Sequence, residues 1–307
     1  MIFFAINKHM TKSKMQISLK MLNPLDELCF VNVTDEEFDA EELQYLGLPK
    51  SLLKKFKLNH KPLNGVSQES PSQPLMIKNG NVFPPCITEF KFTDIFDLKM
   101  TSNYIAYSRS KMPEYVRKLK NCLVFDMTGN IGCDAANFAY TFEKNDVNSS
   151  VFVCEFEKMK ADCLKFNLRT FKNVYVFAGD SMVLLQAIKN KDVEVIKNML
   201  ISDNTDFDYE INELLKLKVV VNIDPPFGKD YDKTKATCPL EFNDEPVIKC
   251  LAKNRCSRFT TYIIKSPHNW DMYQKYTFKR VTVYTLKSSY YYNIITPSEL
   301  LKVSKLL

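Results

Sequence analysis

Histidine and paired cysteines are scarce in this chain of 307 residues. It has three histidines and nine cysteines, and no two cysteines follow the C-x-x-C spacing. These counts predict no metal site, and an odd number of cysteines argues against a disulfide framework. We therefore expect the protein to work in a reducing compartment inside the cell, nuclear or cytoplasmic.

Long hydrophobic runs are also missing. The apolar residues 1–6 are too few to cross a membrane or to form a secretory core, so we expect no membrane partner. The formal net charge of +6 is a mild bias toward polyanions. Basic side chains gather between Lys50 and Lys61, where five lysines lie close together. That run fits a solvated helix face and an RNA-contacting patch equally well.

Glycine is rare as well, with seven residues in the chain, at positions 47, 65, 80, 129, 132, 179 and 228. Four of them follow predicted strands or come just after Pro226. Glycine is needed where the backbone turns sharply or lets a ligand approach. The placement therefore marks the loops after those strands as candidate ligand sites.

Hydrophobic patterning divides the chain at about residue 85. Residues 1–85 predict a small, mainly helical N-terminal extension, with short helices between residues 24 and 58, and a Pro- and Ser-rich linker. Residues 86–307 alternate strand and helix patterns, which predicts an α/β domain with a doubly wound, mostly parallel, Rossmann-like sheet. Residues 189–209 are polar and poorly patterned, and residues 279–295 predict a closing antiparallel pair. The predicted strands are 122–126, 150–155, 174–177, 219–223 and 260–265, and the predicted helices are 112–119, 134–142, 158–171, 181–188 and 246–253.

The segment Asp224-Pro225-Pro226-Phe227 directly follows the β-branched strand 219–223. Two prolines end the strand because neither has an N–H group to donate. The carboxyl ends of parallel strands are where open α/β sheets bind ligands. An acid, fixed carbonyl groups and an aromatic ring at that place predict a site for a planar amine, although a structural turn is the alternative.

Three further loops carry candidate ligand contacts at the same predicted edge. The stretch from Asp126 to Asp134 joins a strand to a helix through Gly129 and Gly132, and Asp134 is expected to cap that helix. Glu155 ends the second strand and is expected to accept both hydroxyl groups of a ribose, with Glu157 as the alternative if the strand runs two residues longer. Asp180 follows the third strand, where it is expected to accept an adenine amine or to cap a helix.

This order of motifs resembles the class I S-adenosylmethionine-dependent methyltransferases across roughly residues 95–296. Within them the chain is most similar to the trimethylguanosine synthase family of RNA cap guanine-N2 methyltransferases, including viral relatives. The likeness lies in Ser110–Glu114, in Asp126-x-Thr128-x-x-Ile131-Gly132, in Phe227–Tyr231 and in Lys265–Asp271. The chain departs from the family pattern at Met112, Cys133, Phe227 and Lys229.

The resemblance implies methyl transfer from S-adenosylmethionine to the exocyclic N2 amine of a (7-methyl)guanosine in an RNA 5′ cap. It implies no metal, and the partner is RNA with a capped end. The alternatives are an adenine-N6 or cytosine-N4 methyltransferase of DNA or RNA, and a catalytically silent RNA-binding scaffold. The implied catalytic residues are Asp224, Pro225, Pro226 and Phe227; the implied cofactor-binding residues are Asp126, Thr128, Gly129, Gly132, Asp134, Glu155, Asp180 and Asp224; and the implied substrate-binding residues are Phe227, Lys229, Lys265, Asn269 and Trp270.

Overall fold

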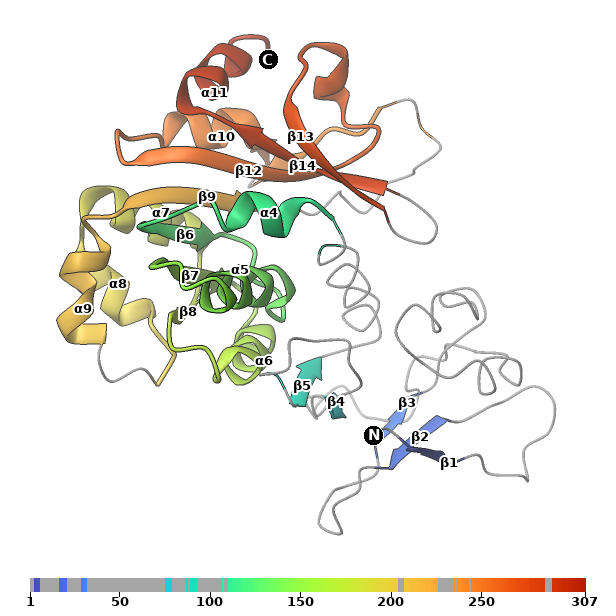
Figure 1. Cartoon of the computed structure of the whole chain (residues 1–307). Helices are drawn as coiled ribbons and strands as arrows, with labels where there is room; N and C mark the ends of the chain where they lie inside the picture. Colours follow the sequence, from blue (N-terminus) through green and yellow to red (C-terminus); the bar gives the residue numbers. More distant parts are fainter. Residues whose placement is uncertain are drawn as a thin grey trace. The chain divides into compact units, whose positions relative to one another are not determined.

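The chain forms two compact units, residues 1–105 and residues 106–307 (Figure 1). The computed structural model describes residues 3–5, 17–20, 29–31, 75–78, 87, 89–92, 107, 110–203, 207–225, 235, 237–242, 244–284 and 289–307.

The first unit contains short antiparallel strands. β1 (Phe3–Ala5), β2 (Ile17–Lys20) and β3 (Cys29–Val31) form one sheet, and β4 (Leu75–Lys78) pairs with β5 (Glu89–Phe92). β3 lies inside the stretch predicted as short helices, so the helical prediction is wrong at Cys29–Val31, where aromatic and β-branched side chains favour a strand. The lysines from Lys50 to Lys61 lie outside the described residues.

The second unit is built on a seven-stranded sheet with the order β13–β14–β12–β9–β6–β7–β8. β6, β7, β8, β9 and β12 are parallel, and β14 runs antiparallel to both β12 and β13. The predicted doubly wound, mostly parallel fold is therefore confirmed. The strands are β6 (Cys122–Asp126), β7 (Ser150–Glu155), β8 (Val174–Ala178), β9 (Lys218–Ile223), β12 (Phe259–Pro267), β13 (Lys279–Tyr284) and β14 (Ser289–Ile295).

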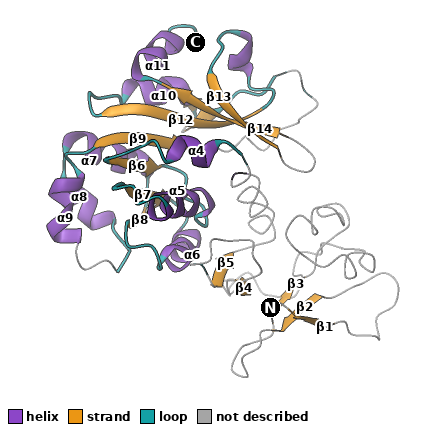
Figure 2. Ribbon diagram, in the orientation of Figure 1, coloured by secondary structure: helices purple, strands orange, loops and turns teal. Residues whose placement is uncertain are grey.

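Helices cover both faces of this sheet (Figure 2). Leu123 and Phe125 of β6 belong to one hydrophobic cluster with residues of α7 to α11. Val124 between them is also buried but lies outside that cluster, as the alternation of side chains in a strand requires. The helices are α4 (Met112–Val116), α5 (Cys133–Lys144), α6 (Lys158–Leu168), α7 (Ser181–Asn190), α8 (Val193–Met199), α9 (Phe207–Leu214), α10 (Val247–Lys253) and α11 (Pro297–Ser304). Two further short strands, β10 (Glu241–Phe242) and β11 (Glu245–Pro246), pair with each other, and a 3-10 helix, η1, spans Asp271–Gln274.

The segment 189–209, predicted to be polar and unpatterned, contains α8 and the start of α9. Ile196 and Phe207 from this segment are buried in the cluster on the α7 side of the sheet. The prediction missed them because a seven-residue helix with one fully buried side chain shows almost no periodicity. None of the helices in the described part is long and apolar enough to cross a membrane.

The parallel strands all end at one edge of the sheet. The loops after β6, β7, β8 and β9 therefore lie along this edge, together with the end of β12. β14 begins there too, because Tyr290 pairs with Pro267 at the end of β12. We call this edge the carboxyl edge.

Candidate active site

Asp224 and Lys265 form a buried ion pair at the carboxyl edge. β9 and β12 are neighbours with Ile223 opposite Ile264, so the register places the next residues of the two strands side by side. The Lys265 ammonium group donates to Asp224 Oδ2 over 2.5 Å, and the two side chains are 5% and 20% exposed. The family resemblance implied that Lys265 binds substrate, whereas in this structure it pairs with the acid of the candidate catalytic segment.

A second acid and two tyrosines surround the same lysine. Asp134 Oδ2 lies 4.0 Å from Lys265 Nζ, and Asp134 Oδ1 accepts a hydrogen bond of 2.9 Å from the Tyr292 hydroxyl group. The ammonium group also lies 4.8 Å from the ring centroid of Tyr290. Burial lowers the pKa of Lys265, but Asp224 and then Asp134 outweigh it, so the pKa is raised and the lysine is a cation.

The Asp224 carboxyl group experiences opposing effects. Burial raises its pKa, while the adjacent Lys265 ammonium group lowers it and Asp134 raises it, with a net rise above the usual value. Lys265 occupies Oδ2, so Oδ1 is the oxygen available to a substrate amine. Removing Lys265 would remove the main influence that keeps this carboxyl group ionised.

The predicted helix cap at Asp134 is wrong. α5 begins at Cys133, and its N-cap residue is Gly132, in the left-handed conformation with φ of 101°. Asp134 therefore lies in the first turn, where its carboxylate faces Lys265 and Tyr292 instead of the free backbone N–H groups.

Asp126 ends β6 as a buried carboxyl group that is 1% exposed. Asp126 and Asn222 are opposite each other in the sheet, and Asn222 Nδ2 donates to Asp126 Oδ1 over 3.0 Å. Within the described part, Asp126 Oδ2 has no hydrogen-bond partner. Burial, followed by the charge of Asp134, raises the pKa of Asp126 to about 7.

Thr128 joins the loop after β6 to the loop after β9. Its hydroxyl oxygen accepts a 2.7 Å hydrogen bond from the backbone N–H of Asp224. Sequence analysis assigned Thr128 to the cofactor site only by resemblance. The structure gives it a definite contact with the candidate catalytic residue.

The glycines of the first loop are required by packing. A Cβ atom on Gly129 would lie 2.6 Å from Val153 Cγ2 and 3.0 Å from the Cys154 carbonyl oxygen. The Gly129 N–H group donates to that same carbonyl, and Asn167 Nδ2 donates to the carbonyl of Ile131 over 2.8 Å. The loop is therefore held against β7 and α6.

Glu155 fastens this loop from the end of β7. Its carboxylate accepts hydrogen bonds from the backbone N–H groups of Asn130 (2.7 Å) and Glu157 (2.9 Å). A carboxylate has about four acceptor positions, so these two bonds leave about two for the predicted ribose hydroxyl groups. The ribose contact stays a prediction.

Phe156, which sequence analysis missed, lies between Glu155 and Glu157 and is 80% exposed. An aromatic ring this exposed beside the glycine loop offers a stacking surface for a planar ligand. Its position directly after the strand-ending acid was the signal in the sequence.

Asp180 is the N-cap of α7, where its Oδ1 accepts a hydrogen bond of 2.8 Å from the Met182 N–H group. This matches the capping alternative considered from the sequence. The adenine contact at its second oxygen stays a prediction.

Asn269 and Trp270, predicted to bind substrate, have internal partners here. Asn269 Nδ2 donates to the Lys235 carbonyl oxygen over 3.1 Å, and the Asn269 carbonyl accepts from the Cys238 N–H group. Trp270 is 2% exposed and stacks on Phe278 at a centroid distance of 5.2 Å. These contacts favour a structural role, and a substrate role stays a prediction.

Several predicted site residues lie outside the described residues, namely Pro226, Phe227 and Lys229. Pro225 is described and directly follows Asp224 at the carboxyl edge. No cluster of acids, histidines and cysteines suited to a metal occurs in the part of the chain that the structure describes.

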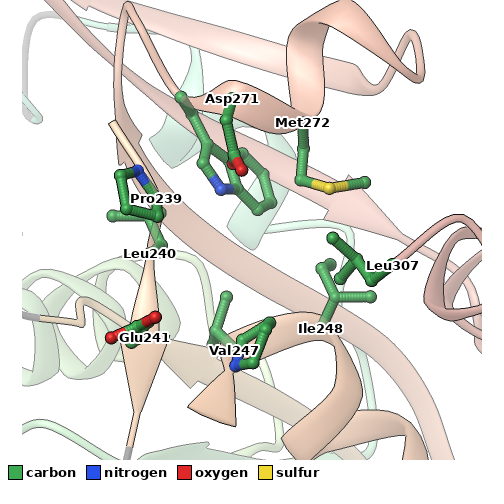
Figure 3. Close-up of a pocket in the computed structure, with 10 residues that line it drawn as sticks. Pro239, Leu240, Glu241, Val247, Ile248, Asp271, Met272 and Leu307 are labelled. Atoms are coloured by element: carbon green, nitrogen blue, oxygen red, sulfur yellow. The ribbon is translucent and has the colours of Figure 1, made fainter. Parts of the chain in front are cut away.

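A cavity that Trp270 helps to line is too small for a cofactor. It has a volume of about 30 Å³ and is lined by Pro239, Val247, Met272 and Leu307 among others (Figure 3). That space holds one or two waters at most. A second, shallow hollow of about 420 Å³ lies over α7 and the start of α8, and none of the residues that line it is a predicted site residue. The candidate site is placed at the carboxyl edge because the ends of β6, β7, β9 and β12 bring predicted site residues together there.

Comparison with known proteins gives likenesses of fold only. No protein family and no curated protein sequence matches the chain. Among solved structures, one similar chain is a SAM-dependent methyltransferase from Agrobacterium tumefaciens, with 9% identity, coverage of 75% of this chain and 72% of that chain, and a TM-score of 0.40. A precorrin-6y C5,15-methyltransferase from Geobacter metallireducens has 12% identity, coverage of 60% and 85%, and a TM-score of 0.32. The methyltransferase domain of METTL16 has 11% identity, coverage of 60% and 66%, and a TM-score of 0.36. The assignment of the fold rests on the strand order and direction described above.

Proposed function

We propose that this protein transfers a methyl group from S-adenosylmethionine to the exocyclic N2 amine of guanosine in an RNA 5′ cap. The observation that carries the proposal is the Asp224 carboxylate at the end of β9, held by Lys265 and Thr128. The choice of cap guanine over other amines comes from the sequence resemblance. The reaction belongs inside the cell, where capped RNA is found.

The residues at the carboxyl edge fit the proposed cofactor. Glu155 has acceptor positions left for ribose hydroxyl groups, and Phe156 offers its exposed ring to an adenine. Asp126 Oδ2, a buried acceptor without a partner in the described part, fits the ammonium group of an amino-acid moiety. The cofactor would supply a methyl group bound to a positively charged sulfur; as the new N–C bond forms, the S–CH3 bond breaks and the sulfur leaves as a neutral thioether.

An aromatic amine is a poor nucleophile, and Asp224 would compensate for this. The nitrogen lone pair of such an amine is delocalised into the ring. Asp224 Oδ1 and the Pro225 carbonyl oxygen would accept hydrogen bonds from its two N–H groups. These bonds orient the nitrogen and stabilise the positive charge that develops on it as the new N–C bond forms. A carboxylate achieves this only when it is ionised, and the Lys265 ammonium group favours that form.

Identification of the methylated nucleoside tests the proposal. The protein is incubated with methyl-labelled S-adenosylmethionine and capped RNA, uncapped RNA or DNA, and the digested product is analysed by mass spectrometry. We expect N2-methylguanosine from capped RNA alone, and no transfer by Asp224→Ala although calorimetry still shows cofactor binding. N6-methyladenosine or N4-methylcytidine would replace the cap assignment with the other amines. Cofactor-independent RNA binding without transfer would indicate a silent scaffold.

A further inference from the structure

The C-terminal part of the chain is basic, as is the run from Lys50 to Lys61. Residues 272–307 hold six lysines or arginines and one acid, Glu299, which is a local charge of +5 within a total of +6. The Glu299 carboxylate accepts a hydrogen bond from the Thr296 N–H group in the capping box of α11. The basic residues are Lys275, Lys279, Arg280, Lys287, Lys302 and Lys305.

Aromatic rings accompany these charges. Arg280 is exposed, and its guanidinium carbon lies 4.3 Å from the ring centroid of Tyr291 and 4.9 Å from that of Tyr273. Lys302 is also exposed and lies 5.7 Å from the ring of Tyr276. Arg280 donates a hydrogen bond to the Tyr273 hydroxyl group. A guanidinium group has five N–H donors, so further edge N–H groups remain for a phosphate.

The pairing of β13 with β14 places the C-terminal end of β13 at the carboxyl edge. Arg280 and Tyr284 are four residues apart on β13 and therefore point to the same face of the sheet. Tyr284 pairs with Ser289, one step beyond the pair of Val283 and Tyr290, so it lies at the edge where β14 begins. Tyr284 is 75% exposed. About 13 Å of strand separate it from Arg280.

We infer that Tyr284, Arg280 and Lys302 form a surface that binds single-stranded RNA next to the reactive base. Exposed rings with adjacent cations are the combination that single-stranded nucleic acid requires, because bases stack and phosphates need counter-charges. The position beside the carboxyl edge gives the surface its place in substrate binding, and that part of the inference rests on the proposed function.

Protection of an edge strand is the competing explanation. β13 is the last strand of the sheet, and charges on edge strands prevent pairing with other chains. That explanation accounts for Lys279 and Arg280, but it leaves the exposed ring of Tyr284 and the charge of Lys302 on α11 without a purpose. It also predicts that RNA affinity is independent of these side chains.

The test is fluorescence anisotropy with a 5′-labelled, uncapped 20-nucleotide RNA over a range of salt concentrations. One variant carries Arg280→Gln and Lys302→Gln, and a second carries Tyr284→Ala, whose exposed side chain contributes little to folding. The matched control is Lys118→Gln with Lys120→Gln, which removes the same charge from two exposed residues just before β6, at the opposite edge of the sheet.

The slope of log K against the logarithm of the salt concentration should become less negative by about 1.4 in the charge variant. Each lost phosphate contact contributes about 0.7 to this slope for a single strand, and the variant loses two. If the wild type and the charge variant bind equally at 1 M salt, this difference in slope corresponds to a loss of about 25-fold in affinity at 0.1 M salt. Tyr284→Ala should weaken binding at all salt concentrations by a similar factor, with an unchanged slope. The control should bind like the wild type.

Equal effects in the charge variant and the control would overturn the inference, as would wild-type affinity in both test variants. Equal binding of a DNA duplex and the single strand would also overturn it, because the surface would then be merely electrostatic. The assay uses no cap and no methyl transfer. Failure of the proposed function would therefore show as absent methylation with intact RNA binding, which is a different result.

Discussion

Replacing Lys265 with methionine should show how strongly the charge of this lysine controls the pKa of Asp224 and the stability of the protein. The substitution keeps much of the side-chain volume but removes the cation 2.5 Å from Asp224 Oδ2. An opposite charge at such a distance lowers a carboxyl pKa by about 1–3 units, so its loss should raise the pKa of Asp224 by that amount. Breaking a buried pair by removing one partner should also lower the free energy of unfolding by about 3–5 kcal/mol.

The pH dependence of kcat/KM for capped RNA measures the first effect. If transfer requires ionised Asp224, the acidic limb of the profile should move to higher pH by about 1–3 units in Lys265→Met, and Lys265→Arg should restore most of the wild-type profile. Asp134→Asn should move the limb the other way, because Asp134 raises the pKa of Asp224. Calorimetry with S-adenosylmethionine shows whether each variant still folds and binds the cofactor.

The free energy of unfolding is a second, independent test of the Asp224–Lys265 ion pair. Urea unfolding of Lys265→Met, Asp224→Asn and the double variant forms a thermodynamic cycle for the two contacting residues. The double variant should be more stable than Lys265→Met, because it leaves one acid without its cation, Asp134, instead of two. The reasoning is refuted if Lys265→Met keeps the wild-type pH profile, or if Lys265→Met and Asp134→Asn shift it in the same direction.

Three further predictions concern single side chains. Asp126 has a pKa of about 7, well above its usual value of about 3.9, so the wild type should lose stability as pH rises from about 4 to 7. Asp126→Asn avoids that loss, so in urea unfolding the free energy of unfolding of the variant should exceed that of the wild type by an amount that grows from pH 4.5 to about 4 kcal/mol at pH 8. The same difference in unfolding free energy at both pH values would contradict this. Phe156→Ala should weaken S-adenosylmethionine binding by about 1–3 kcal/mol in calorimetry and leave the melting temperature unchanged, since the ring is 80% exposed. Trp270→Ala should lower the free energy of unfolding by about 3–5 kcal/mol, with Trp270→Phe milder, and a stable Trp270→Ala protein that fails only in RNA binding would restore its predicted substrate role.

The sheet could be predicted from the sequence because buried parallel strands are short runs of β-branched and aromatic residues. The bounds predicted for 122–126 and 150–155 agree with β6 and β7. The N-cap of α5 could not be predicted, because it depends on the left-handed backbone of Gly132, and the cap predicted at Asp134 was wrong. α8 was missed because its single fully buried residue, Ile196, gives no helical repeat.

The site was predictable only as far as the ends of the strands. Parallel strands end at one edge, so the loops that carry Asp126, Glu155 and Asp224 could be placed together from the order of elements. The partner of Asp224 could not be foreseen. It depends on the register of β9 against β12, which brings Lys265 beside an acid 41 residues earlier in the chain.

The hydrogen bond from the Asp224 N–H group to Thr128 has a thermodynamic consequence. It joins the loop proposed to hold the cofactor to the loop proposed to hold the amine, so we expect a ligand that shifts one loop to affect the other. Any effect of the first ligand on the affinity for the second must then be matched by an equal effect in reverse. We therefore expect Thr128 to link the two proposed binding equilibria.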